Sequence, residues 1–142
     1  MANFNLKIIT PERIVFDQPV DQLTAVANDG ELTVLPGHEP LVTTLSINVL
    51  RFKIGQEEHS AAVLGGILEV GQKETVVLSD VAELDHEIDE ARATQAQERA
   101  KAAKTQRAEN IEVYATEMAL SKAMARLKAA ELGKLRRRAH KN

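Results

Sequence analysis

The chain changes its backbone chemistry near residue 84, and this change limits the possible fold more than any other feature. All four prolines and six of the seven glycines lie in the first 71 residues. The residues Val, Ile and Thr number 23 in residues 1–83 but only 6 in residues 84–142, where alanine is abundant. β-Branched side chains suit a pleated sheet, and alanine is the best helix former. The sequence therefore predicts an α+β chain of two domains, residues 1–83 all-β and residues 84–142 all-α.

The first 83 residues have the regular spacing of short strands that is typical of a β-sandwich. Short apolar runs alternate with turn residues at intervals of about eight to twelve residues, which predicts an antiparallel β-sandwich of about ten strands. Leu50, Phe52 and Ile54 should share one face of a strand, because side chains alternate along it. Gly65-Gly66 interrupts an apolar run and predicts a bulge or a close backbone approach. The expected strands span residues 4–9, 13–16, 20–27, 31–35, 41–44, 48–54, 58–64, 67–70 and 74–79.

Residues 84–142 predict an antiparallel hairpin of two helices. The first helix should begin at about residues 85–89, where acidic side chains favour a helix start, and should end at about Gln106. Asn110 is a good N-cap for a second helix, and Gly133 should stop that helix just after Leu132.

Both expected helices carry seams of small side chains. Alanine lets two backbones approach closely, but it buries little apolar area, which is worth about 25 cal/mol per Å2. We therefore expect the hairpin to need a partner, a ligand or the β domain to hold it. The small seam positions are Ala93, Ala96, Ala100 and Ala103 in the first helix and Ala115, Ala119 and Ala123 in the second. In the second helix a stripe of larger side chains lies beside the small one: Val113, Leu120, Met124 and Leu127.

Net charge divides at the same place. Residues 1–83 carry a net charge of −7 and residues 84–142 a net charge of +4, and from Lys122 to the C-terminus the net charge is +7. One interpretation is a partner with a fixed acidic surface. The other is that cations at the end of a helix complement its dipole and keep it in solution. Charge alone does not decide between them.

The sequence lacks the residue patterns of an enzyme or a metal site. Its four histidines are scattered, with no i, i+4 pair, and it contains no cysteine. It has no glycine motif that cradles phosphate, and no serine lies in a nucleophile elbow. No apolar run approaches the roughly 20 residues of a membrane-spanning helix. We expect no catalytic residues, no bound metal and no required cofactor.

Two constellations of residues rise above this background. The first is GELTVLPGHEPL at residues 30–41, followed by GGILEV at residues 65–70. The second is IDEARA at residues 88–93, at the start of the first helix. In this order and spacing they closely resemble the epsilon subunit of the F-type ATP synthase, of the bacterial or plastid type. The resemblance covers essentially the whole chain, including the β domain followed by a helical hairpin.

The resemblance implies a non-catalytic subunit of the central rotor stalk. In this family the β-sandwich binds the gamma subunit and the ring of c subunits. The hairpin folds against the sandwich or extends toward the alpha/beta catalytic head, where it inhibits ATP hydrolysis. The implied location is peripheral, at the cytoplasmic face of the plasma membrane or the stromal face of the thylakoid.

Particular residues acquire roles from the same resemblance. The resemblance implies that four residues contact the c-ring and gamma: Glu31, Pro36, Gly37 and His38. For Glu31 and His38 there is also a simpler interpretation, as polar turn residues that favour solvent. The resemblance also implies that four cations contact an acidic segment of a beta subunit and inhibit ATP hydrolysis. We call these four residues the basic set: Lys122, Arg126, Lys128 and Arg136.

ATP is the candidate regulatory ligand, because in some bacterial relatives the IDEARA motif binds ATP in the folded-down hairpin. Ile88, Asp89 and Ala93 would then hold the adenine side and Arg92 the phosphates. Arg99 and Arg126 would add charge, since a triphosphate needs several convergent cations. Lys122 stands where strong ATP binders are expected to carry arginine. A simpler interpretation of Asp89 and Arg92 is an i, i+3 ion pair on a helix.

Two other classes of protein remain open on the residues alone. One is a free-standing β-sandwich adaptor whose helical hairpin docks another protein. The other is a nucleic-acid binder that uses the basic tail at residues 134–141. The net negative charge, the few aromatic residues and the acidic first domain argue against the nucleic-acid binder.

Overall fold

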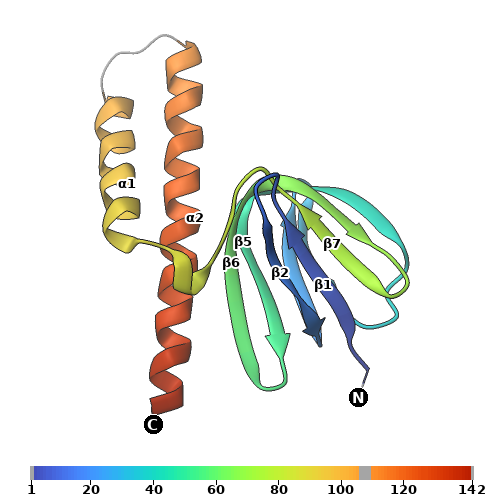
Figure 1. Cartoon of the computed structure of the whole chain (residues 1–142). Coiled ribbons are helices and arrows are strands. Elements are labelled where there is room, and N and C mark those ends of the chain that lie inside the picture. The colour runs from blue at the N-terminus through green and yellow to red at the C-terminus, as the bar shows by residue number, and fades with distance from the viewer. Residues whose placement is uncertain (1, 106–109, 142) are drawn as a thin grey trace.

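The computed structural model describes residues 2–105 and 110–141 and places a β domain beside a helical hairpin (Figure 1). A short 3-10 helix, η1 (Asp85–Glu87), joins the β domain to α1 (Glu90–Thr105) and α2 (Asn110–Lys141). The predicted α+β class and the order of its two parts are confirmed. The strands are β1 (Phe4–Ile9), β2 (Ile14–Val20), β3 (Gln22–Ala27), β4 (Gly30–Val34), β5 (Leu41–Ile54), β6 (Glu57–Val70), β7 (Glu74–Leu78) and β8 (Ala82–Leu84).

The eight strands form one hydrogen-bonded sheet that curls around a common core. Their order is β2-β1-β7-β6-β5-β3-β4, and β8 pairs with β6. Among the described strands, β1 and β7 run parallel while the other neighbours are antiparallel. The prediction of a purely antiparallel sandwich is therefore corrected at one pair of strands.

The structure has eight strands where about ten were expected. Of the nine expected ranges, two pairs merge into the long strands β5 and β6, and β8 was not expected. β5 and β6 have 14 residues each and pair from Leu41 opposite Val70 to Ile54 opposite Glu57. Gly65 and Gly66 lie inside β6 and do not end it. Gly66 has a φ of 132°, and a Cβ there would overlap the carbonyl oxygen of Leu78. The predicted close backbone approach is confirmed, and the predicted strand break is wrong.

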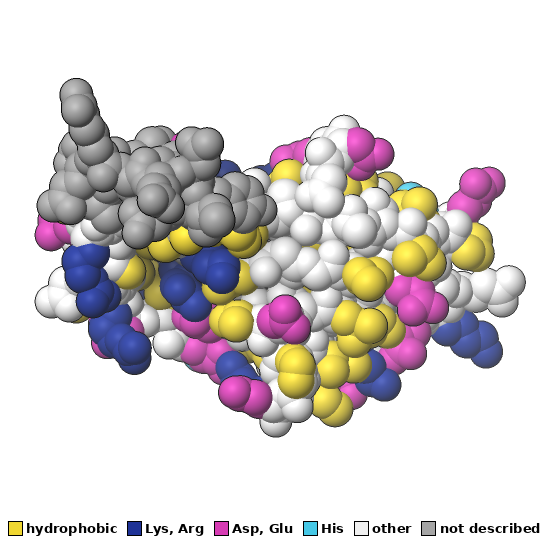
Figure 2. Space-filling model, turned by 90° about the horizontal axis from the view of Figure 1, so that it is seen from above, with side chains coloured by type: hydrophobic (Ala, Val, Ile, Leu, Met, Phe, Trp, Pro, Cys, Tyr) yellow, Lys and Arg dark blue, Asp and Glu magenta, His cyan; other side chains and the backbone are white. Residues whose placement is uncertain are grey.

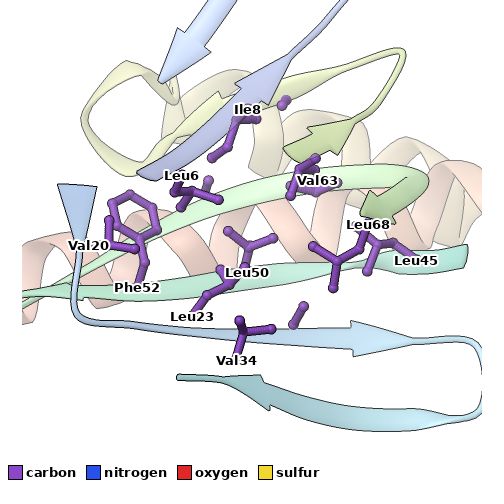
Figure 3. Close-up of a cluster of buried hydrophobic side chains, with 14 of the residues drawn as sticks. Leu6, Ile8, Val20, Leu23, Val34, Leu45, Leu50, Phe52, Val63 and Leu68 are labelled. Atoms are coloured by element: carbon purple, nitrogen blue, oxygen red, sulfur yellow. The ribbon is translucent and has the colours of Figure 1, made fainter. Parts of the chain in front are cut away.

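The main core lies between the layers of the curled sheet (Figure 3). Side chains alternate along β5, so Leu50 and Phe52 enter this core and Ile54 packs at its edge. The shared face predicted for these three residues is confirmed. Between them, Arg51 and Lys53 point the other way, and Lys53 is exposed.

A second, smaller apolar cluster joins α2 to the outer face of β5 and β6. Ala125 and Ala129 of α2 pack here against Val49 and Ala62, with four half-buried neighbours at the edge. The hydroxyl of Ser60 donates to the carbonyl oxygen of Ala129 at 3.2 Å. The β domain thus supplies the support that the alanine-rich hairpin was expected to need. The neighbours are Ile47, Leu64, Ile88 and Leu132.

The predicted helix seams are only partly right. Ala93, Ala100 and Ala123 are buried, and Ala96 is half-buried. Ala115 and Ala119 are exposed, so this part of the predicted stripe is wrong, and the alanines of α2 that become buried are Ala125, Ala129 and Ala130. Met124 is exposed, and Leu120 and Leu127 are half-buried. The predictions for Ala103, Gln106, Val113 and the side chain of Asn110 lie outside what the structure describes.

Gly133 does not stop the second helix, which continues to Lys141. A Cβ at Gly133 would lie 2.9 Å from both Cβ and Cγ of Asp85. Glycine costs a helix about 1 kcal/mol relative to alanine, a cost that continued packing of α2 outweighs. The residue is therefore required for close packing on η1 and does not act as a terminator.

We predict that Gly133→Ala destabilises the docked helix although alanine is the better helix former. The added methyl overlaps Asp85, and overpacking of this kind costs about 1–3 kcal/mol. Urea unfolding followed by far-ultraviolet circular dichroism measures the effect. Arg138→Ala, at an exposed position of the same helix, serves as the control and should change stability by less than about 0.5 kcal/mol. A Gly133→Ala chain at least as stable as the wild type contradicts this account.

Candidate functional site

The IDEARA motif lies where η1 passes into α1. Asp89 is the N-cap of α1, because its Oδ1 accepts the backbone N–H of Arg92 at 3.2 Å and its carbonyl accepts the N–H of Ala93 at 3.0 Å. An acidic N-cap satisfies a free N–H and favours the positive end of the helix dipole. This cap fixes the direction of Arg92 and Ala93 at the start of the helix.

Five of the six residues predicted to bind ATP line one pocket of about 340 Å3 between the two helices and the β domain, which we call the motif pocket. Its volume is that of a small-ligand site. Ile88 lies elsewhere, in the apolar cluster between α2 and the sheet. The sequence did not single out the remaining lining residues Glu83, Glu87 and Ala96. The five are Asp89, Arg92, Ala93, Arg99 and Arg126.

Two of the three acidic side chains that line the motif pocket are paired with arginines, and the third, Asp89, accepts the backbone N–H that caps α1. Glu83 Oε1 accepts the Nε–H of Arg126 at 3.0 Å. Glu87 accepts two bonds from Arg13, at 2.7 and 3.0 Å, and these bonds lower the pKa of its carboxyl. Three guanidinium groups line the pocket, and the charge of Glu87 is offset by Arg13 from the turn after β1. The arrangement suits an anionic ligand, because its carboxylates already have partners.

The four residues of the basic set lie in different environments in the structure. Arg126 pairs with Glu83, and Arg136 pairs with Asp85 at 2.9 Å, so both cations contact acidic residues near the domain junction. Lys122 is half-buried and Lys128 is exposed. Two of the four residues predicted to face an external acidic partner are thus engaged within the chain in this conformation.

The predicted contact loop lies between β4 and β5. Glu31 is exposed near the start of β4, with its Oε1 3.6 Å from Nη2 of Arg51. Pro36 and Gly37 form a tight turn in which the N–H of His38 donates to the carbonyl of Leu35 at 3.1 Å. His38 Nδ1 lies 2.6 Å from the carbonyl oxygen of Glu39. Glu31 and Gly37 are exposed and Pro36 and His38 are half-buried, which suits either of the two interpretations.

An apolar surface on the β domain was not singled out from the sequence. Val42 is 68% exposed, and Ile67 and Leu78 are each more than 40% exposed. A hollow of about 440 Å3 is lined by Ile67 and Leu78, together with residues that include Ile9, Pro11 and the Gly65-Gly66 segment. Figure 2 shows hydrophobic side chains gathered on the surface of this domain. We call these three exposed residues with the hollow the apolar patch; the GGILEV motif was its only signal in the sequence.

The described residues, 2–105 and 110–141, contain no cluster of three or more potential metal ligands. None of the helices there is both long and apolar enough to span a bilayer.

Both parts of the chain match models of known protein families. Residues 3–85 match "ATP synthase, Delta/Epsilon chain, beta-sandwich domain", and residues 86–131 match "ATP synthase, Delta/Epsilon chain, long alpha-helix domain". The chain therefore belongs to the ATP synthase delta/epsilon chain family, as the motifs at residues 30–41, 65–70 and 88–93 indicated.

Relatives with high coverage agree with this membership. The ATP synthase epsilon chain of Dehalococcoides mccartyi is 46% identical over 132 residues, covering 92% of this chain and 94% of the relative. That of Desulforamulus reducens is 44% identical over 126 residues, covering 89% and 96%. The family membership favours an ATP synthase subunit over the adaptor and the nucleic-acid binder.

Solved structures show the same fold. A chain in the Euglena gracilis mitochondrial ATP synthase, in a structure containing OSCP, F1 and the c-ring, has a TM-score of 0.78 and 26% identity. The match covers 92% of this chain and 82% of that one. A chain in the central stalk and c-ring structure of the Tetrahymena thermophila mitochondrial enzyme has a TM-score of 0.61 and 14% identity, covering 89% and 96%. The second likeness concerns the fold alone.

Proposed function

We propose that this chain is a non-catalytic subunit of the central stalk of a rotary ATP synthase. In this role its β domain joins the gamma subunit to the c-ring, and its helical hairpin regulates ATP hydrolysis by the alpha/beta head. The chain would then be peripheral to the membrane through the assembled complex. The observation that carries the proposal is an exposed apolar patch on a β domain whose whole length matches the family.

The apolar patch is the strongest candidate for the rotor contact. Exposed, contiguous apolar side chains beside a hollow are typical of protein interfaces. Ile67 of β6 stands opposite Leu78 of β7 in the strand register, so the two side chains extend the same face of the sheet. The loop with Glu31, Pro36, Gly37 and His38 would add polar contacts at the rim.

We predict that Ile67→Asp and Leu78→Asp each weaken binding to gamma and the c-ring by about 30-fold or more, which corresponds to the loss of a central interface residue. Glu12→Gln, at an exposed position of the same domain, should bind normally. A chain truncated after residue 88 should still assemble, because the patch and the loop both precede that residue. Reconstitution with purified gamma and c-ring measures the binding of all four altered chains. Normal binding by both Asp variants overturns the assignment of the patch.

ATP is the second element of the proposal, as a regulatory ligand of the motif pocket. Arg92, Arg99 and Arg126 converge there with Asp89 and Ala93. The bond from Arg126 to Glu83 uses only Nε–H, so it does not occupy the terminal N–H groups of that guanidinium. When bound, the triphosphate would bridge cations from both helices and so hold the hairpin closed. No catalytic step is assigned to the ligand.

We predict that ATP raises the melting temperature of the wild-type chain and that Arg92→Ala abolishes the increase. A ligand that binds only the compact state stabilises it by about 2.7 kcal/mol at a hundredfold excess over Kd. Lys101→Ala removes an exposed cation from the same helix and should leave the ATP effect intact. Thermal scans with and without ATP give the answer, and an absent shift in the wild type removes ATP from the proposal.

The basic set is the third element, as an electrostatic contact with an acidic surface of the catalytic head. A helix end with this many like charges repels itself, and an acidic partner relieves the repulsion. Each exposed pair is worth only about 0.2–1 kcal/mol, so several must act together.

We predict that changing Lys122, Arg126, Lys128 and Arg136 together to alanine raises ATP hydrolysis by the assembled complex without loss of assembly. Higher salt should partly imitate this effect by screening. The double variant at Lys122 and Lys128 leaves the pairs with Glu83 and Asp85 intact and therefore isolates the external contact. Steady-state hydrolysis across a salt series is the measurement, and equal rates for wild type and quadruple variant at every salt concentration contradict the idea.

A further inference from the structure

The junction between the domains contains a carboxylate that is almost fully removed from water. The side chain of Asp85 in η1 is 2% exposed. Its Oδ2 accepts Arg136 Nη1 at 2.9 Å and lies 3.4 Å from the hydroxyl of Ser60. A buried carboxylate that loses its cation is strongly destabilised, so docking of α2 depends on Arg136 reaching this position. Gly133, one turn earlier, makes room for Asp85.

The same guanidinium group contacts an imidazole. Arg136 Nη1 lies 2.7 Å from Nδ1 of His59 in β6. A guanidinium can only donate, so Nδ1 of His59 must be the acceptor and must carry no proton. The neutral ring then has its proton on Nε2, which lies 3.1 Å from Oε2 of Glu57. The contact as observed therefore requires neutral His59.

Groups from four elements surround this imidazole. β6 contributes Glu57, and β5 contributes Phe52, whose ring stacks on it with centroids 5.6 Å apart. η1 contributes Asp85 and α2 contributes Arg136. Burial and the nearby guanidinium lower the pKa of His59, and they outweigh Glu57 and Asp85, which act in the opposite direction.

Solvent can reach the ring through a pocket of about 410 Å3 between the end of α2 and the β5–β6 hairpin. Charged side chains that line it beside His59 and Arg136 are Arg51, Glu57 and Glu58. Arg51 lies 3.8 Å from Glu58 through Nη1 and 3.6 Å from Glu31 through Nη2, so its charge is shared between these two carboxylates. A proton from solvent therefore has access to His59 without prior opening of the helix.

We propose that Asp85, Arg136 and His59 form a proton-sensitive lock that holds the hairpin against the β domain, and that protonation of His59 opens it. Protonation places an N–H and a positive charge against the guanidinium, so the two groups can no longer bond. The released end of α2 carries Arg136, whose charge then becomes available to an acidic surface. The effect on ATP hydrolysis rests on the proposed function, whereas the lock is a property of the isolated chain.

The direction of the pH effect follows from the lowered pKa. With α2 detached, His59 titrates near its ordinary value of about 6.5, whereas in the docked state it titrates lower. Above that ordinary value both states are neutral, and the lock contributes its full stability. As the pH falls below it, the detached state gains the proton first, so docking is progressively lost.

The test uses the full chain alone, so its outcome is independent of assembly with other subunits. The cysteine-free sequence allows a donor and an acceptor dye at Asp29→Cys and Lys128→Cys, which are exposed positions on the β domain and on α2. Single-molecule energy transfer then gives the fraction of detached molecules. We expect this fraction to rise severalfold when the pH falls from about 7.5 to about 5.5, across the ordinary pKa of histidine.

Variants separate the lock from general acid sensitivity. His59→Gln keeps an acceptor for Arg136 but cannot titrate, so its detached fraction should stay low and independent of pH. Asp85→Asn should be detached at both pH values. Arg138→Gln removes an exposed cation two residues beyond Arg136 and should behave as the wild type does. A pH-independent wild type overturns the proposal, as does a His59→Gln chain that responds like the wild type.

A second measurement needs no substitution at His59. Nuclear magnetic resonance of the ring protons should show His59 titrating below its ordinary pKa in the wild type. In Arg136→Gln, which removes the facing cation, the pKa should move upward. Equal titration of His59 in the two chains overturns the proposal even if the His59→Gln protein does not fold.

Discussion

The docked hairpin depends on the smallness of the side chains between α2 and the β domain. Ala125 and Ala129 meet Val49 and Ala62, and Gly133 stands against Asp85, so the helix backbone comes close enough for Arg136 to reach a buried carboxylate. Small contacts of this kind bury little apolar area, so docking depends all the more on the buried carboxylate keeping its cation. The result is a helix whose docked position is defined by close backbone approach and one buried ion pair, with little apolar area to hold it.

The composition of the chain was sufficient to predict its division into β and α parts, because strand and helix preferences change together near residue 84. The alternation of side chains along the sequence was likewise sufficient to predict the faces of β5, where Leu50 and Phe52 alternate with Arg51. The helix stop expected at Gly133 and the strand break expected at Gly65-Gly66 were wrong for a common reason, although the close backbone approach predicted at Gly65-Gly66 is confirmed. A glycine that permits close packing has the same local sequence as a glycine that ends an element, and tertiary contact alone distinguishes the two.

The candidate site was predictable where it depends on neighbours along one helix. Asp89, Arg92 and Ala93 lie within one turn, so the motif itself places them together. Arg13 beside Glu87, and His59 beside Arg136, are 74 and 77 residues apart, and only the pairing of strands and the docking of α2 bring them together. Patterns of local spacing carry no information on such contacts. Both missed contacts are at the domain junction, where each domain supplies half of the interaction.

The separation of 51 residues between Asp85 and Arg136 also orders events during synthesis. Domains generally fold from the N-terminus as the chain emerges from the ribosome. The β domain is complete before Arg136, which follows Asp85 by 51 residues, has been made. Asp85 must therefore remain hydrated on the surface of a finished β domain until the helical turn that carries Arg136 arrives. A nascent chain thus passes through the undocked arrangement before the junction can close.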